Sequence, residues 1–133
     1  MELCPHSSSM VFIMANLLVN FPAFLRAEAN EALSDDKSGD MKGYVYDGSD
    51  GSQIVLWDCP NGGVSARHVH DFDEYAIIVS GSYTGFAGDE KVVLNPGDEC
   101  FIPAGVWHEG IYSKNYRAID GFANKRVKKK ADM

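Results

Sequence analysis

The chain has 133 residues, the length of one ordinary domain, and 45% of them are hydrophobic, which is enough for a sizeable core. Residues 1–124 hold seven basic and eighteen acidic side chains, a net charge of -11, and this acidic body excludes nucleic acid as the main partner. Three cysteines without a C-x-x-C spacing exclude a zinc knuckle and a thioredoxin-like pair, and a reducing cytoplasm is the simplest location.

Residues 1–41 predict a leader followed by one short helix. The apolar run at 10–19 is too short to span a bilayer, and Lys and Arg are missing before it, so we expect neither a signal peptide nor a membrane segment. Met14 is an alternative to Met1 as the start of translation. Residues 20–33 have apolar side chains at helical spacing, with Asn20 as a cap and Pro22 in the first turn, which predicts an amphipathic helix.

Residues 42–122 predict eight to ten short strands separated by turns. The expected strands lie at 43–47, 53–59, 75–86, 91–94, 100–103, 106–112 and 116–122, with a further one around the histidines at 68 and 70. Turn residues such as Asn95-Pro96-Gly97 punctuate them. This pattern predicts an all-β sandwich or barrel without a second domain. Residues 123–133 form a basic tail, which we expect to be solvated and frayed.

Two segments of this β region hold three of the four histidines. On a strand, His68 and His70 project from one face, about 7 Å apart. Glu74 opens the next apolar strand and can bring a carboxylate to the same face, and His108 from a separate segment can close the set. Two or three imidazoles with a carboxylate suit a divalent transition metal, namely iron, manganese, nickel, copper or zinc. The alternative is that these are ordinary core histidines beside solvated turn residues.

The order and spacing of these residues resemble the paired signature of the cupin superfamily. The pattern G-x5-H-x-H-x3-E-x6-G fits Gly62, His68, His70, Glu74 and Gly81. The pattern G-x5-P-x-G-x2-H fits Gly97, Pro103, Gly105 and His108, but Tyr112 stands where the family motif normally ends in Asn. The resemblance implies a double-stranded β-helix, or jelly-roll, barrel over residues 42–122. It also implies one divalent transition metal held by His68, His70, Glu74 and His108.

The implied function is that of a metal-dependent enzyme acting on a small molecule. Three imidazoles and one carboxylate leave coordination positions open, as catalytic metal sites do. We expect first a dioxygenase acting on a small aromatic or keto-acid substrate, with Glu74 as ligand or base and Tyr112, on the face of His108, as the second catalytic candidate. The alternatives are an isomerase or lyase acting on a sugar-like substrate, and a non-catalytic ligand-binding or sensing protein.

A small apolar pocket is expected beside the metal. Strand parity places Ala76 and Ile78 on the face of Glu74, and the candidate walls are Trp57, Tyr83, Phe101 and Trp107. By resemblance the protein is expected to be a homodimer, without a membrane or nucleic-acid partner.

Overall fold

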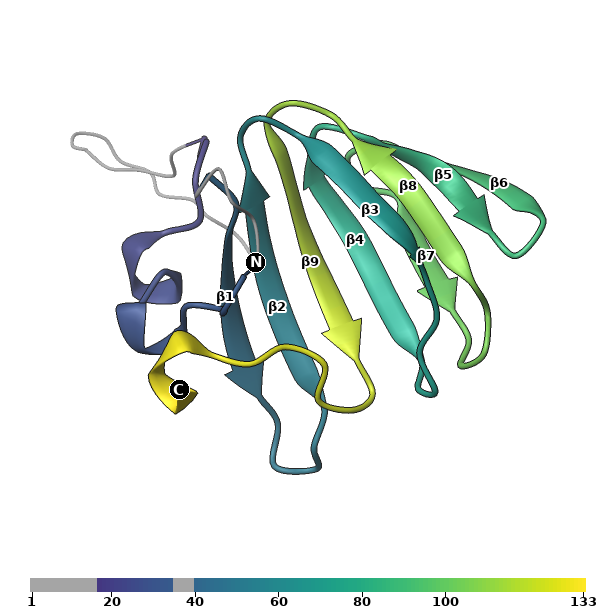
Figure 1. Ribbon diagram of the computed structural model, residues 1–133. Coiled ribbons are helices and arrows are strands. Elements are labelled where there is room, and N and C mark those ends of the chain that lie inside the picture. The colour runs from purple at the N-terminus through teal and green to yellow at the C-terminus, as the bar shows by residue number, and fades with distance from the viewer. Residues whose placement is uncertain (1–16, 35–39) are drawn as a thin grey trace, which may run out of the picture.

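The structure is a computed structural model that describes residues 17–34 and 40–133. Nine antiparallel strands make it all-β, as predicted (Figure 1). The strands are β1 (Lys42–Asp47), β2 (Gln53–Cys59), β3 (Gly63–His68), β4 (Glu74–Ser80), β5 (Tyr83–Ala87), β6 (Glu90–Leu94), β7 (Glu99–Ile102), β8 (His108–Tyr112) and β9 (Tyr116–Phe122). Among the described residues, no helix is long and apolar enough to cross a membrane.

The strands form two sheets arranged as a jelly roll. One sheet has the order β1-β2-β9-β4-β7, and the other has the order β3-β8-β5-β6. After β2 the chain passes repeatedly between the sheets, so that strands far apart in sequence become neighbours. β8 pairs with β3 and brings His108 opposite His68, while β9 pairs with β4 beside Glu74. This topology places the candidate ligands at one end of the barrel.

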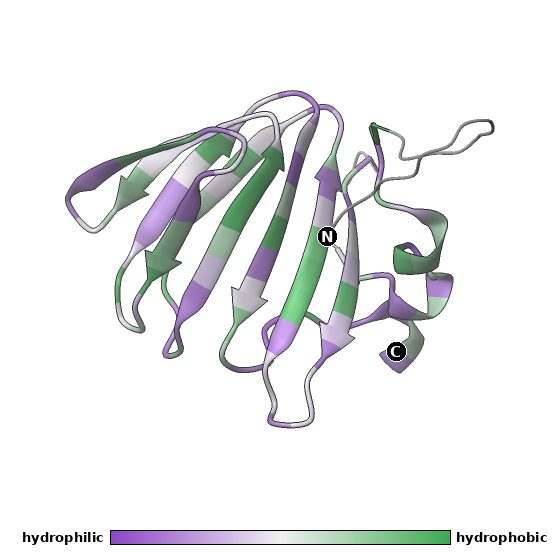
Figure 2. Ribbon diagram, turned by 180° about the vertical axis from the view of Figure 1, so that it is seen from behind, coloured by the Kyte–Doolittle hydropathy of each residue, from purple (hydrophilic) through white to green (hydrophobic). Residues whose placement is uncertain are grey.

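Alternation of apolar and polar side chains gives each sheet an inner and an outer face, and Figure 2 shows the mixed bands along the strands. The inner face of β9 carries Tyr116, Ala118 and Phe122, all buried. Val45 and Val55 are fully buried with Phe122, whereas Ile78 packs in a second cluster. The core therefore lies between the inner faces of the two sheets.

The N-terminal segment is helical over two separate 3-10 turns rather than over one continuous helix at 20–33. The turns are Ala23–Leu25 and Glu28–Asn30, with extended backbone between them. Phe21 is buried against Tyr44 and Leu56, and the N–H of Ala32 donates to the carbonyl of Gly43 at 2.7 Å. Packing and pairing with β1 thus fix this segment in a form that an amphipathic helix cannot adopt.

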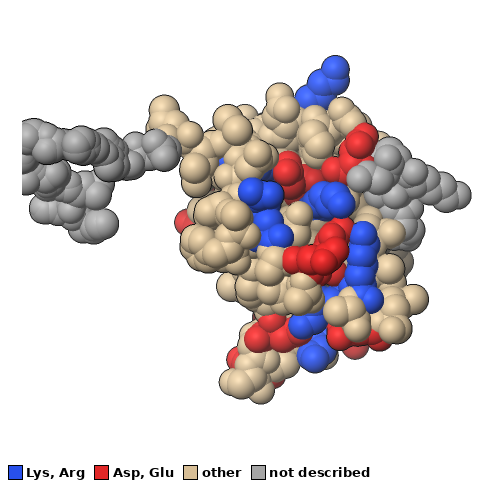
Figure 3. Space-filling model, turned by 90° about the vertical axis from the view of Figure 1, so that its left-hand side faces the viewer, with Lys and Arg blue, Asp and Glu red and all other residues tan. Residues whose placement is uncertain are grey.

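The basic tail is docked on the barrel, contrary to the expectation of a frayed end. It runs back across β2 and β1 to the N-terminal segment (Figure 1), where Ala32 and Lys129 form an antiparallel bridge. Lys129 pairs with Asp47 at 3.2 Å and Lys130 pairs with Glu31 at 2.7 Å. Figure 3 shows this side of the molecule, with basic and acidic side chains next to one another. Charge complementarity and backbone pairing therefore hold the tail.

Gln53 is the main polar contact between the tail and the barrel. This buried side chain accepts hydrogen bonds from the N–H groups of Arg126 and Val127 at 2.9 and 3.0 Å. It donates to the carbonyl of Val127 at 2.9 Å and to the carboxylate of Asp47 at 3.0 Å. Three of these four bonds fix residues 126–127 over the first sheet, and the fourth, to Asp47, orients the amide group.

We expect Gln53→Ala to lower the free energy of unfolding by about 2–4 kcal/mol, because it leaves three partly buried backbone groups of the tail without their partners. Chemical denaturation measures the loss, and amide hydrogen exchange at 126–130 should rise. Thr84→Ala, at an exposed strand position, should cost less than about 0.5 kcal/mol. Unchanged exchange in the tail of the Gln53 variant would contradict the role assigned to this side chain.

Candidate metal centre

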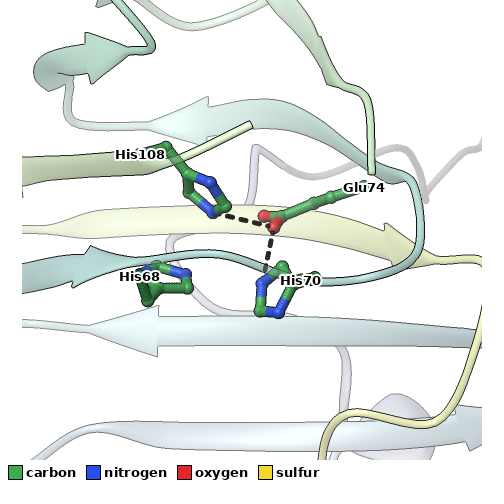
Figure 4. Close-up of side chains that lie close together, drawn as sticks. All are labelled: His68, His70, Glu74 and His108. Carbon is green, nitrogen blue, oxygen red and sulfur yellow. Dashed lines mark ion pairs between the residues drawn. The ribbon is translucent and has the colours of Figure 1, made fainter. Parts of the chain in front are cut away.

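Four side chains from separate elements converge at one end of the barrel. His68 ends β3, His70 lies just after it, Glu74 begins β4 and His108 begins β8. One ligand atom from each residue lies within 4.8 Å of the other three (Figure 4). The structure thus brings together the four residues that the sequence singled out. Their placement differs in one respect: His70 is not on the strand of His68, since β3 ends at His68, which pairs with His108 after a register shift that follows Ser65.

The nitrogen and oxygen atoms that face one another in this group have no ordinary partners. Oε1 of Glu74 lies 3.3 Å from Nε2 of His70 and 3.3 Å from Nε2 of His108. All three atoms are buried and form no hydrogen bond. Buried polar atoms without partners are costly, and a cation between them would satisfy all three. The donor set therefore fits one divalent metal ion.

The opposite ring nitrogens orient two of the imidazoles. Nδ1 of His68 contacts the carbonyl of Ala66 at 2.7 Å, and Nδ1 of His108 contacts the carbonyl of Val106 at 3.0 Å. A carbonyl accepts only from a protonated nitrogen, so the proton sits on Nδ1 and the Nε2 lone pair is available to a metal. The third imidazole, that of His70, stacks on Phe72 with ring centroids 4.8 Å apart.

The electrostatic surroundings favour the neutral, metal-binding form of two histidines. Burial lowers the pKa of His68 and the pKa of His70. Burial also lowers the pKa of His108, but the Glu74 carboxylate and the Val106 carbonyl outweigh it, so that the net shift is upward. A bound cation would supply the positive charge beside Glu74 that a proton on His108 would otherwise supply.

A cavity of about 690 Å³ opens from this group into the barrel. Trp57, Tyr83 and Ala76 line it, as predicted. Ile78 instead belongs to the packed core. The expectation for Phe101 and Trp107 is wrong: these side chains are 62% and 47% exposed and lie outside the cavity lining.

Strand register and a surface contact explain the two misplaced aromatic side chains. Phe101 pairs with Tyr75 across β7 and β4, and both side chains point outward. Trp107 precedes β8 and stacks under Arg67, whose guanidinium carbon lies 5.4 Å from the indole centroid.

Tyr112 lines the same cavity but stands apart from the four-residue group. Its hydroxyl donates to the sulfur of Met41 at 3.6 Å, and its ring covers Gly63 and lies 5.0 Å from the ring of Tyr116. The ring of Tyr83 occupies the space over Gly110, where any side chain would collide with it. Gly110 lies between His108 and Tyr112 on the inner face of β8. The ring of Tyr83 therefore lies over this face of β8 between the positions of His108 and Tyr112. A catalytic role for Tyr112 stays a prediction.

Asp120 is an acidic residue of the cavity lining that the sequence analysis did not identify. Asp120 pairs with Ala76 in the register of β9 and β4, and Glu74 pairs with Phe122, so the two acids occupy diagonal positions about 7–8 Å apart at their Cα atoms. Burial, then repulsion by Glu74, raise the pKa of Asp120 to about 8, although Arg126 and a hydrogen bond from Trp57 oppose the shift. Strand parity could have identified this residue, since Asp120 lies two residues from buried Ala118 and two from buried Phe122 and therefore shares their face of β9.

Comparisons with known proteins agree with this architecture. The family model described as "Cupin domain" matches residues 55–115. KdgF from Halomonas sp. is 22% identical, with a TM-score of 0.61 over 70% of this chain and 86% of that chain. An RmlC-like cupin from Shewanella frigidimarina is 23% identical, with a TM-score of 0.62 over 74% and 87% of the two chains. A putative mannose-6-phosphate isomerase from Ralstonia eutropha is 20% identical, with a TM-score of 0.56 over 67% and 89%. No curated protein matches the sequence.

Proposed function

The chain carries a cupin domain, and we propose that it is a metal-dependent isomerase or lyase acting by proton transfer on a small oxygenated acid. The observation that carries this proposal is the half-buried carboxyl of Asp120 in the cavity that His68, His108 and Glu74 also line. A module that only bound a ligand would need no group able to exchange protons at neutral pH. An acid with a pKa near the working pH can both donate and accept a proton.

His68, His70, Glu74 and His108 are the residues that would hold the metal. When bound, the ion would polarise a carbonyl or hydroxyl oxygen of the substrate and make an adjacent C–H or C–O bond easier to break. Neutral Asp120 would donate a proton to the departing or rearranging group, and its carboxylate form would abstract one. Trp57, which donates to Asp120, would hold the carboxyl in position.

One further feature of this cavity supports proton transfer. Burial raises the pKa of Tyr83 to about 12, so its hydroxyl stays protonated and can donate a hydrogen bond to the substrate. Neighbouring structures of the same fold include the putative mannose-6-phosphate isomerase and DMSP lyases, whose names belong to these two reaction classes.

Deuterium exchange tests the proposal directly. The metal-loaded protein would be incubated in D2O, without dioxygen, with a panel of small hydroxy, keto and sugar acids, and followed by proton NMR. We expect metal-dependent loss of a C–H signal, followed by isomerised or unsaturated product. Metal binding without exchange or turnover of any panel member, with or without dioxygen, would support the non-catalytic binding protein instead.

Dioxygen chemistry is the second candidate, because the ligand set favours it. Nitrogen and oxygen ligands with open positions suit iron, manganese and nickel, which sequence reasoning ranks first for this reason. The two candidates make opposite predictions about air. An isomerase or lyase turns over equally well under argon, whereas a dioxygenase consumes one equivalent of dioxygen per turnover and stops without it.

A further inference from the structure

The mouth of the cavity carries positive side chains, in contrast to the acidic charge of the body of the chain. Arg126 and Lys128 line the mouth from the docked tail, and Arg67 lines it from β3. Arg67 is already engaged, since its guanidinium lies 3.5 Å from the carboxylate of Glu109 and stacks on Trp107. Arg126 and Lys128 are exposed to solvent and so remain accessible to a ligand.

The cations of the tail divide into two sets. Lys129 and Lys130 fasten the tail through ion pairs with Asp47 and Glu31. Within residues 17–34 and 40–133, no carboxylate forms an ion pair with Arg126 or Lys128. Two positive charges are thus placed at the cavity mouth while their neighbours in sequence hold the backbone in place.

The ring of Phe122 lies between Arg126 and His70 of the candidate metal centre. The guanidinium carbon of Arg126 lies 5.1 Å from the ring centroid of Phe122, and this ring lies 6.1 Å from that of His70. Gln53 fixes the backbone of Arg126, and the carbonyl of Lys128 accepts the N–H of Leu33 at 2.7 Å. Backbone contacts therefore help to set the positions of both residues. The guanidinium of Arg126 also lies over the Phe122 ring, but among the described residues neither charged group is held in an ion pair.

We propose that Arg126 and Lys128 form an anion-binding site that recognises a carboxylate or phosphate at the end of the substrate remote from the metal-bound end. The planar guanidinium can bind an oxyanion with two hydrogen bonds, and the ammonium adds a point charge. An acidic body repels anions elsewhere, so the cationic mouth also guides them to the cavity. This inference rests on the proposed function, because it requires the other end of the same molecule to lie at the four-residue group.

The test compares ligands that differ only in the remote charge. A series of 2-oxo dicarboxylic acids with one to four methylene groups would be titrated calorimetrically, each beside the ester of its remote carboxylate. The variants are Arg126→Gln and Lys128→Gln, and the matched control is Lys125→Gln. Lys125 carries the same charge on the same segment but lies outside the cavity lining.

We expect at least one diacid to bind about tenfold more tightly than its ester, as two charge-assisted contacts would give. Either cavity-mouth variant should reduce this ratio by about three- to fivefold without weakening ester binding, whereas the Lys125 variant should keep it. Equal affinities for diacid and ester throughout the series, or equal losses in all three variants, would overturn the anion site. Metal content is measured separately: a chain that takes up no metal but keeps the ratio contradicts the proposed enzyme and leaves the anion site standing.

Discussion

His108→Ala should weaken metal binding at least about a hundredfold, because loss of a group that merely orients a ligand already costs about 10–100-fold. His108 contributes one of the three orphaned buried atoms, so its removal opens the donor set and leaves Glu74 with one of its two imidazole neighbours, His70. A hundredfold loss of affinity corresponds to about 2.7 kcal/mol of metal-linked stabilisation at saturating metal. Elemental analysis of protein purified without affinity nickel measures metal content, and melting with and without added metal measures the stabilisation.

Three further variants are compared with His108→Ala in this experiment. His68→Ala should behave like His108→Ala, since both imidazoles belong to the same group. Tyr112→Phe should retain the metal, because its hydroxyl lies with Met41 and not among the ligand atoms. His6→Ala removes the one histidine outside the two motifs and should also retain it. Equal metal contents in all four proteins would refute the ligand assignment.

Strand and turn patterns alone predict an all-β sandwich or barrel, and the resemblance to the paired cupin signature adds the jelly roll and the convergence of the four ligand residues. Inner and outer faces follow from strand parity, and the spacing of His68, His70, Glu74 and His108 places them at strand ends that the topology joins. Parity also explains Phe101, which points outward, once the register of β7 with β4 is known. Register depends on pairing between distant strands, and a single strand does not encode it.

The terminal segments illustrate the opposite case. Helical spacing at 20–33 is overruled by the burial of Phe21 and by pairing of Ala32 with Gly43. The tail looks like a solvated basic end, yet one glutamine 73 residues before Arg126 holds it in place. Contacts of this kind join segments that have no local relation in sequence. They also decide which cations reach the cavity, so sequence reasoning could not place Arg126 and Lys128, the residues that we propose to bind the substrate's remote anion.

Asp120→Asn should lower turnover by about 10²–10⁴-fold, the usual contribution of a positioned acid or base, while metal content stays unchanged. The amide keeps the shape of the carboxyl and can still accept the hydrogen bond from Trp57, but it cannot transfer a proton. If the neutral acid is the active form, activity of the unmodified protein should fall as the pH rises through the pKa of Asp120, which burial raises. Asp89→Asn, in an exposed turn, is the control and should alter neither turnover nor its pH profile.

The same substitution should change the free energy of unfolding in a pH-dependent way that an ionised structural carboxylate would not give. Burial raises the pKa of Asp120 to about 8 in the folded protein, against an ordinary value of 3.8, so the folded state binds the proton more tightly than the unfolded state does. The stability that this carboxyl contributes is therefore complete below about pH 4 and is lost as the pH rises toward 8. Asp120→Asn should consequently stabilise the metal-free protein at pH 7, by up to about 4 kcal/mol, with little effect at pH 4. Denaturant titrations at both pH values measure this, and destabilisation at pH 7 would show that Asp120 is an ionised structural group rather than a proton donor.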